Sequence, residues 1–343
     1  MSVLNGHDLR EAGLYLGPLD PIETGFGSRG PFKVNYQKIS GVHEDNKDIH
    51  LFIPQKEGEE IAEEKYPVVF FSQGFAMSDP FIYDVFIDHI VSQGAVVVFV
   101  PHRNIFRLPG GPGNYEMLFD GYTKAVRKGI SFIDTSRIGV VGRSFGGGAA
   151  PWLTYKMINE HGWGEDKAFM FIMAPWYFHK ITDEQLASFP DHVKLHIQVY
   201  SDDKINDPAI ASELFGTISI PEKNKLFSIV YSDTGKDYNG DFYIYSANHQ
   251  VPKSNVDTRA VYDGYLYHAV IKQYHILFDS VMNQESEAME ILNTGLKNPK
   301  LCSMGVWPDG RAVRPIKVTR NPQLDKGSLS FYFPFTSILN PRR

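Results

Sequence analysis

The sequence contains a single cysteine, Cys302, among its 343 residues. One cysteine excludes an intramolecular disulfide and a metal site built from several thiolates. We therefore expect side-chain packing to stabilise the fold, and we expect no metal ion or other cofactor.

An excess of positive charge is also missing. Lys and Arg number 34 against 40 Asp and Glu, which gives a net charge of -6. Proteins that bind nucleic acid usually carry a basic surface that neutralises phosphate groups, so nucleic acid is excluded as an expected partner.

Long apolar runs are absent too. The longest apolar stretch, Ala95 to Pro101, is far too short to cross a bilayer. The first residues, MSVLNGHDLREAG, show no basic region followed by an apolar run, as a signal peptide would. The sequence thus predicts no transmembrane segment and, by default, a cytoplasmic location.

The residues that are present indicate a folded α/β protein. Hydrophobic residues make up 43% and charged residues 22%, as in ordinary globular chains. Runs such as VVFF and AVVVFV are apolar throughout, which is typical of strands buried on both faces of a parallel sheet. The predicted strands are Lys33–Ile39, Ile49–Ile53, Pro67–Ser72, Ala95–Val100, Arg137–Val141, Ala168–Met173, Lys194–Tyr200 and Asp241–Tyr245.

Helical segments separate these strands, which favours a mostly parallel, doubly wound sheet flanked by helices. The predicted helices are Asp79–Gln93, Tyr115–Phe132, Gly146–Glu160 and a long stretch, Thr258–Leu292, with a break near Asn283. Asn239-Gly240 predicts a hairpin turn.

We expect three parts along the chain. Residues 1–30, rich in Gly and Pro, form an N-terminal surface wrap. Residues 31–295 form the catalytic domain. Residues 296–343 form a C-terminal extension that packs on this domain, with a turn at WPDGRAV, a short strand at SLSFYFPF and no helix.

The strongest chemical signal is Gly142-Arg143-Ser144-Phe145-Gly146, which follows the apolar strand IGVV and precedes a run of small residues. Flanking glycines allow a tight strand-to-helix turn that exposes the serine oxygen. The pattern Gly-x-Ser-x-Gly also occurs by chance in chains of this length. Between an apolar strand and a run of small residues, however, it predicts a nucleophile elbow, with Ser144 as nucleophile.

A serine hydroxyl needs a base, and the base needs a carboxylate that holds its ring. In the α/β-hydrolase fold the order along the chain is serine, acid, histidine. His249 follows the strand-like DFYIY, and we predict it as the base. His102 precedes the nucleophile, whereas His268 and His275 lie inside a helical pattern.

The acid is expected directly after the strand KLHIQVY. Asp203 is the favoured residue, with Asp202 and Asp207 as alternatives that would otherwise serve a turn or a helix cap.

Acyl transfer also needs two N–H donors aimed at the developing oxyanion. One should be the backbone N–H of Phe145, the residue after the nucleophile. The other should come from the loop after the third strand, where Gly74 lets the backbone turn and Phe75 donates.

With these residues in view, the chain resembles the cutinase-like polyester hydrolases and their relatives, the dienelactone hydrolases and platelet-activating-factor acetylhydrolases. The resemblance runs through FSQGFAMSD, IDTSRIGVVGRSFGGG, APW, YSDDKI and SANHQVPKS, over about residues 30–255. It implies an α/β-hydrolase fold, with Asp203 as acid, Phe75 as the oxyanion-loop aromatic and Trp176 as an aromatic that flanks the substrate.

The chain also departs from these relatives. Arg143 stands where they usually carry His or Trp; we expect it to be salt-bridged or, alternatively, to attract an anionic group of the substrate. Their C-terminal disulfide is impossible here, and the tail after Asn293 has no counterpart in them.

The expected function is hydrolysis of a small-molecule or lipid-like carboxylic ester by Ser144, His249 and Asp203 through an acyl-enzyme. Two alternatives remain open. The same three residues could cleave amides or peptides, or the scaffold could serve as a non-catalytic binding protein.

Overall fold

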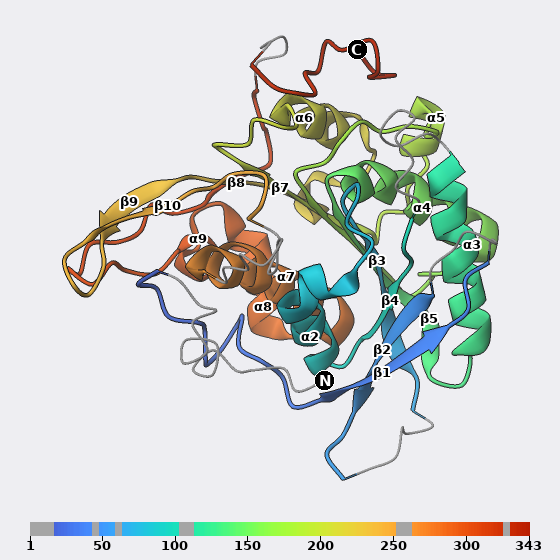
Figure 1. Ribbon diagram of the computed structural model, residues 1–343. Helices are drawn as coiled ribbons and strands as arrows, with labels where there is room; N and C mark the ends of the chain where they lie inside the picture. Colours follow the sequence, from blue (N-terminus) through green and yellow to red (C-terminus); the bar gives the residue numbers. More distant parts are fainter. Residues whose placement is uncertain (1–16, 43–47, 59–63, 103–112, 252–262, 325–329) are drawn as a thin grey trace.

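A mixed sheet of nine strands forms the centre of the molecule (Figure 1). The computed structural model describes residues 17–42, 48–58, 64–102, 113–251, 263–324 and 330–343. Within them the strands are β1 (Lys33–Ile39), β2 (Ile49–Gln55), β3 (Tyr66–Ser72), β4 (Val96–Phe99), β5 (Ile133–Arg143), β6 (Lys167–Met173), β7 (Lys194–Tyr200), β8 (Lys225–Val230), β9 (Asp233–Lys236), β10 (Phe242–Tyr245) and β11 (Lys317–Thr319).

The order in the main sheet is β1-β2-β4-β3-β5-β6-β7-β8-β11. The strands from β4 to β8 in this order are parallel. The edges are antiparallel, because β2 pairs with β4, β1 with β2, and β11 with β8. The carboxyl ends of the parallel strands therefore meet at one edge of the sheet, where ligands of open α/β sheets usually bind.

Helices lie on both sides of the sheet. They are η1 (Pro80–Tyr83), α2 (Asp84–Ser92), α3 (Gly113–Lys128), α4 (Phe145–His161), α5 (Asp183–Leu186), α6 (Pro208–Thr217), η2 (Glu222–Asn224), the π-helical η3 (Leu266–Ile271), α7 (Lys272–Phe278), the π-helical η4 (Asp279–Asn283), α8 (Ser286–Thr294), η5 (Gly295–Lys297) and α9 (Pro299–Cys302). The predicted α/β architecture with a mostly parallel sheet is confirmed.

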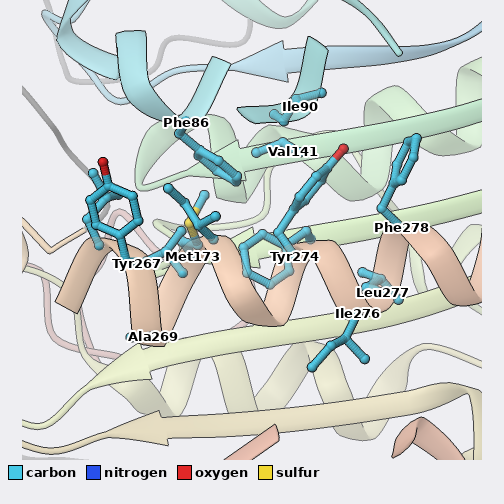
Figure 2. Close-up of a cluster of buried hydrophobic side chains, with 14 of the residues drawn as sticks. Phe86, Ile90, Val141, Met173, Tyr267, Ala269, Tyr274, Ile276, Leu277 and Phe278 are labelled. Carbon is cyan, nitrogen blue, oxygen red and sulfur yellow. The ribbon is translucent and has the colours of Figure 1, made fainter. Parts of the chain in front are cut away.

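Two hydrophobic cores, one on each face, explain the continuous apolar strands. In β3, Val69 and Phe71 face the core under α2 and α7, whereas Val68 and Phe70 face the core under α3, α4 and α6. Figure 2 shows part of the first core, where Phe86 of α2 meets Tyr274 of α7 edge to face at 5.2 Å. Successive side chains point to opposite faces, so a strand covered on both sides must be apolar at every position.

The sequence-based prediction missed β8 and misplaced β10. KLFSIV carries Lys225 and Ser228, and these polar residues hid the last parallel strand of the main sheet, which pairs with β7. The predicted strand at Asp241–Tyr245 exists as β10, but it pairs only with β9 in a separate two-stranded sheet. Phe242 and Ile244 are accordingly exposed. The predicted turn at Asn239-Gly240 joins these two strands, and Gly240 has a φ of 84°.

The predicted break in the long helix is confirmed. The helical run ends at Asn283, Gln284 adopts a left-handed φ of 53°, and α8 begins at Ser286. The predicted start at Thr258 lies outside the described residues. Two π-helical turns flank α7, and π-helical turns commonly occur within longer helices.

The C-terminal segment is more ordered than predicted. The expectation of no helix is wrong, because Asn298 caps the short helix α9 with Pro299 in its first turn. The short strand is β11, which extends the main sheet beside β8, whereas the described part of SLSFYFPF, residues 330–335, forms only an isolated bridge between Phe333 and Asn206. Trp307 is buried against Tyr245 and donates from Nε1 to Asp233 at 2.8 Å, which ties this segment to the β9–β10 hairpin.

The described part of the N-terminal segment crosses the surface between the hairpin and the helices. Leu19 N–H donates to the Tyr245 hydroxyl at 2.9 Å, and Gly27 N–H donates to His275 Nδ1 at 2.9 Å. Arg29 forms an ion pair with Asp88 at 2.9 Å. Among the described residues, none of the helices has the length and apolar character that crossing a bilayer requires.

One buried histidine makes the fold sensitive to acid. His196 on β7 is fully buried, and its Nε2 lies 2.7 Å from Ser228 Oγ on β8. Burial lowers the pKa of His196 to about 3. In the unfolded chain this imidazole has a pKa of about 6.5, so unfolding takes up a proton between these two pH values.

We predict that the free energy of unfolding falls as the pH drops from about 6.5 toward 3, and that His196→Gln reduces this slope by up to ~1.4 kcal/mol per pH unit. Urea unfolding at a series of pH values measures the slope. His161→Gln, at an exposed position, is the control. Equal slopes for wild type and His196→Gln would contradict this explanation.

Candidate active site

Ser144 lies in a sharp turn between β5 and α4, at the carboxyl edge of the sheet. Its backbone has a φ of 53° and a ψ of -115°, which is strained for a residue with a side chain. A Cβ at Gly142 would lie 2.5 Å from Gly146 O, and one at Gly146 would collide with Ser72 O. Only glycine fits at both positions, so the sequence pattern follows from the close approach of these backbones.

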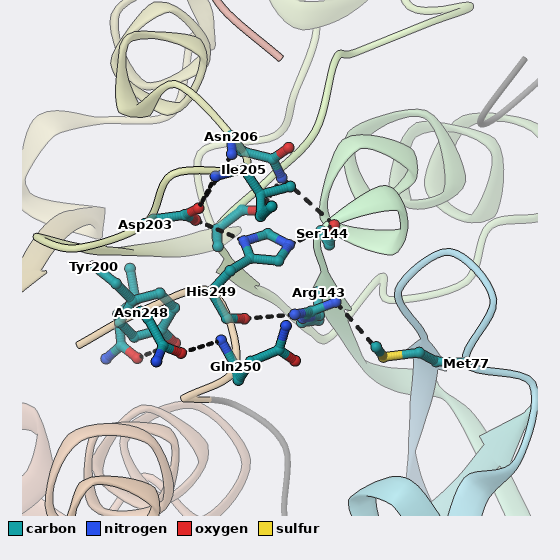
Figure 3. Close-up of polar contacts among 12 residues, drawn as sticks. Met77, Arg143, Ser144, Tyr200, Asp203, Ile205, Asn206, Asn248, His249 and Gln250 are labelled. Carbon is teal, nitrogen blue, oxygen red and sulfur yellow. Dashed lines mark hydrogen bonds and ion pairs between the residues drawn. The ribbon is translucent and has the colours of Figure 1, made fainter. Parts of the chain in front are cut away.

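Ser144, His249 and Asp203 form one hydrogen-bonded relay (Figure 3). His249 Nε2 lies 3.0 Å from Ser144 Oγ, and His249 Nδ1 lies 2.6 Å from Asp203 Oδ2. All three residues are buried. Three segments distant in the sequence thus bring a hydroxyl, an imidazole and a carboxylate together in the predicted order.

The loop that follows Asp203, here called the Asp203 loop, orients the Asp203 carboxylate through backbone N–H groups. Asp203 Oδ1 accepts from the backbone N–H of Ile205 at 2.7 Å and from that of Asn206 at 3.1 Å, which leaves Oδ2 for the imidazole. Backbone donors of this kind fix the carboxylate while the second oxygen holds the ring.

The two alternative acids are engaged elsewhere. Asp202 accepts from Ser232 Oγ at 2.5 Å, on the side of the β9–β10 hairpin. Asp207 caps α6 by accepting from Ala209 N–H at 2.9 Å, and its other oxygen accepts from Phe335 N–H at 2.9 Å.

His249 reaches the site by a different route from the one predicted. The last parallel strand, β8, ends at Val230, and the β9–β10 hairpin stands between it and His249. His249 therefore follows a strand of the hairpin, whereas we expected a strand of the main sheet. The hairpin still returns the chain to the carboxyl edge, because Asp202 N–H donates to Ala247 O at 2.9 Å.

Arg143 forms no salt bridge with a described residue, and its guanidinium contacts the backbone of His249. It is 2% exposed, and its Nη2 donates to His249 O at 2.5 Å while Nη1 lies 3.6 Å from Met77 Sδ. Burial lowers the pKa of its guanidinium. The side chain thus holds the backbone of the loop that carries His249 (Figure 3), and the expected contact of Arg143 with a substrate stays a prediction.

The two candidate oxyanion donors lie on adjoining segments. Gly146 N–H donates to Gln73 O at 3.0 Å and joins the start of α4 to the loop after β3. Phe145 begins α4, so its N–H has no partner within the helix. Within the described residues, the N–H groups of Phe75 and Phe145 both lack a hydrogen-bond acceptor. The His102 ring lies between the two phenyl rings.

Gly74 is needed for a different reason from the one predicted. The left-handed residue of this loop is Ala76, with a φ of 62°. A Cβ at Gly74 would lie 2.5 Å from Arg143 Nη1, so the glycine makes room for the buried guanidinium.

Trp176 lies beside the nucleophile and is mostly buried. Its backbone N–H donates to Ser144 O at 2.8 Å, and its ring is 4% exposed. The ring packs against Phe145 at 6.3 Å and edge to face against Phe333 of the C-terminal segment at 5.7 Å. The C-terminal segment therefore packs against an aromatic residue whose backbone contacts Ser144.

Sequence reasoning missed Asn206. Its side-chain Nδ2 lies 3.5 Å from Ser144 Oγ, and it donates to Ala174 O at 2.8 Å. The only sequence signal was its position three residues after the predicted acid, where an Asn also suits an ordinary turn.

The arrangement can transfer a proton from Ser144 to His249 while Asp203 stabilises the imidazolium, which is the chemistry of nucleophilic catalysis. Groups of three or more His, Cys, Asp or Glu side chains that could hold a metal ion are absent from the described residues. No known family model matches this chain, and no curated protein matches it.

We predict that Gly146→Ala destabilises the chain by at least about 3 kcal/mol, because the new methyl group meets the rigid backbone of Ser72 and Gln73. Gly216→Ala in α6 is the matched control. A Cβ there has nothing within 4 Å, so this variant should gain ~0.5–1 kcal/mol. Urea unfolding measures both, and a Gly146→Ala variant as stable as wild type would disprove the steric argument.

Proposed function

We propose that this chain is a serine hydrolase of the α/β-hydrolase type that cleaves carboxylic esters. The observation that carries the proposal is the relay, in which His249 lies 3.0 Å from Ser144 Oγ and 2.6 Å from Asp203. The strained backbone of Ser144 supports it, because strain of this kind persists chiefly at functional sites.

In the first step Ser144 Oγ attacks the ester carbonyl carbon while His249 Nε2 takes the hydroxyl proton. Asp203 holds Nδ1–H and stabilises the imidazolium. The backbone N–H groups of Phe75 and Phe145 stabilise the negative charge on the carbonyl oxygen. The ester C–O bond then breaks, and His249 gives its proton to the departing alcohol.

In the second step a water molecule attacks the acyl-enzyme carbonyl, and His249 Nε2 takes the proton of this water. The bond between the acyl carbon and Ser144 Oγ breaks, its electron pair goes to Oγ, and His249 returns the proton. The acid product leaves, and the free serine is restored. No cofactor takes part in either step.

The order serine, acid, histidine along the chain and the mostly parallel sheet support the α/β-hydrolase type. The resemblance to cutinase-like polyester hydrolases and their relatives supports an ester substrate, small or lipid-like. The rings of Trp176 and Phe145 pack 6.3 Å apart beside Ser144, and apolar groups at this place would suit an acyl or aromatic part of the substrate.

We predict that Ser144→Ala lowers kcat by roughly 10⁴- to 10⁶-fold and Asp203→Asn by about 10⁴-fold, because each removes one member of the relay. Hydrolysis of nitrophenyl esters measures both. Ser280→Ala is the control, since Ser280 is equally buried but bonds only within its own helical turn. Retained turnover in Ser144→Ala would refute the proposal.

A panel of nitrophenyl esters of increasing acyl length, tested beside the matched anilides, separates the alternatives. Faster cleavage of esters supports the proposal, and the best acyl length measures the size of the acyl pocket. Faster cleavage of anilides would assign amidase activity. A wild-type chain that cleaves neither and does not react with a fluorophosphonate would favour the non-catalytic binding protein.

A further inference from the structure

Asn206 contacts both ends of the relay. Its backbone N–H donates to Asp203 Oδ1 at 3.1 Å, and its side-chain Nδ2 lies 3.5 Å from Ser144 Oγ (Figure 3). The side chain is 3% exposed. We propose that Asn206 orients the Ser144 hydroxyl and stabilises Oγ when the acyl group leaves it. This inference rests on the proposed function.

The orientation of the Asn206 amide follows from its second hydrogen bond. Nδ2 donates one hydrogen to Ala174 O at 2.8 Å, which identifies this end of the amide as the nitrogen. Its other hydrogen is free to point at Ser144 Oγ. An amide nitrogen can only donate a hydrogen bond, so this N–H is directed at a lone pair of Ser144 Oγ.

The consequence concerns the hydroxyl hydrogen of Ser144. A serine hydroxyl has one hydrogen and rotates to suit its neighbours. With one lone pair of Oγ facing Asn206, the hydrogen is left to point at His249 Nε2, 3.0 Å away. Asn206 thereby favours the rotamer from which proton transfer starts.

The same N–H serves again in deacylation. When the bond between the acyl carbon and Oγ breaks, the electron pair stays on Oγ until His249 returns the proton. A donor that is already in position stabilises this developing charge without reorganisation.

Two further observations concern the surroundings of Asn206. The side-chain oxygen Oδ1 of Asn206 is buried and has no hydrogen-bond partner in the described residues. A buried amide with a purely structural role would be expected to form hydrogen bonds at both its oxygen and its nitrogen. The backbone on both sides of Asn206 is also fixed by the C-terminal segment, because Phe333 N–H donates to Ile205 O at 2.7 Å and Asp207 N–H donates to Phe333 O at 3.1 Å.

The first test is Asn206→Leu, which keeps the volume and removes the donor. We expect kcat/KM for a nitrophenyl ester to fall about 10-fold, with KM changed less than about twofold, because the loss corresponds to one hydrogen bond made to the reacting atom. The rate of fluorophosphonate labelling should fall by a similar factor. Asn224→Leu is the control. Asn224 also donates a side-chain hydrogen bond, to Asp191 O at 2.7 Å, but it lies at the amino end of β8, on the side of the sheet away from Ser144.

The second test is Asn206→Asp, which has the same shape but presents an acceptor to Ser144 Oγ. The carboxylate would accept the serine hydrogen and draw it away from His249, so activity should fall further than in Asn206→Leu. Because a protonated carboxyl group can donate again, the deficit relative to wild type should shrink as the pH is lowered. Thermal unfolding of the variant at each pH shows whether a change in stability accounts for this dependence.

The outcomes are distinct. Full kcat/KM in Asn206→Leu, or equal losses in the Leu and Asp variants at every pH, would overturn the role of Asn206 while wild-type labelling upholds the proposed function. A wild-type chain that neither labels nor cleaves esters would overturn both. Thermal unfolding of each variant identifies losses that come from misfolding, and the pH dependence of Asn206→Asp tests the role in a folded chain.

Discussion

The close approach of two backbones, at the start of α4 and at the end of β3, is the constraint on which the site depends. Gly146 N–H donates to Gln73 O at 3.0 Å, and no side chain fits at Gly146. This contact occurs together with the strained conformation of Ser144 and brings Phe145 next to the loop that carries Phe75. Hydrophobic burial on both faces of the sheet holds the two segments together. The free energy gained by packing the core thus offsets the cost of the strained backbone at Ser144.

A second constraint comes from the buried cation beneath the relay. Arg143 is the last residue of β5 and donates to the backbone of His249, so the residue before Ser144 fixes the loop that carries His249. Gly74 makes room for the same guanidinium. The loop that carries Gly74 and Phe75, the turn at Ser144 and the loop that carries His249 therefore meet at one side chain, and this contact couples their positions.

Much of the fold could be predicted because burial on two faces leaves a plain signal. The apolar runs of β3 and β4 are typical of strands covered on both sides. This signal failed at β8, where Ser228 pairs with His196 of β7 inside the sheet. It also failed at β10, whose aromatic residues belong to an exposed hairpin and not to the main sheet. Local composition does not reveal which strand a segment will pair with.

The candidate site was predictable where local geometry demands particular residues, as at Gly142, Ser144 and Gly146. It was less predictable where a partner comes from far along the chain. The acceptor for Arg143 is a backbone carbonyl 106 residues away, and Asn206 contacts a serine 62 residues before it. Such contacts depend on tertiary packing, and an isolated Arg or Asn in a sequence does not report them.

The pairing of Phe333 with the loop that follows Asp203 also has a consequence for biosynthesis. Chains are made from the N-terminus, so this loop obtains these backbone partners only after Phe333 has been synthesised. A nascent chain can already contain Ser144, Asp203 and His249, yet until that point it lacks the segment whose backbone holds both Ile205 and Asp207. The contacts within the relay can therefore form before the loop around Asp203 is fully supported.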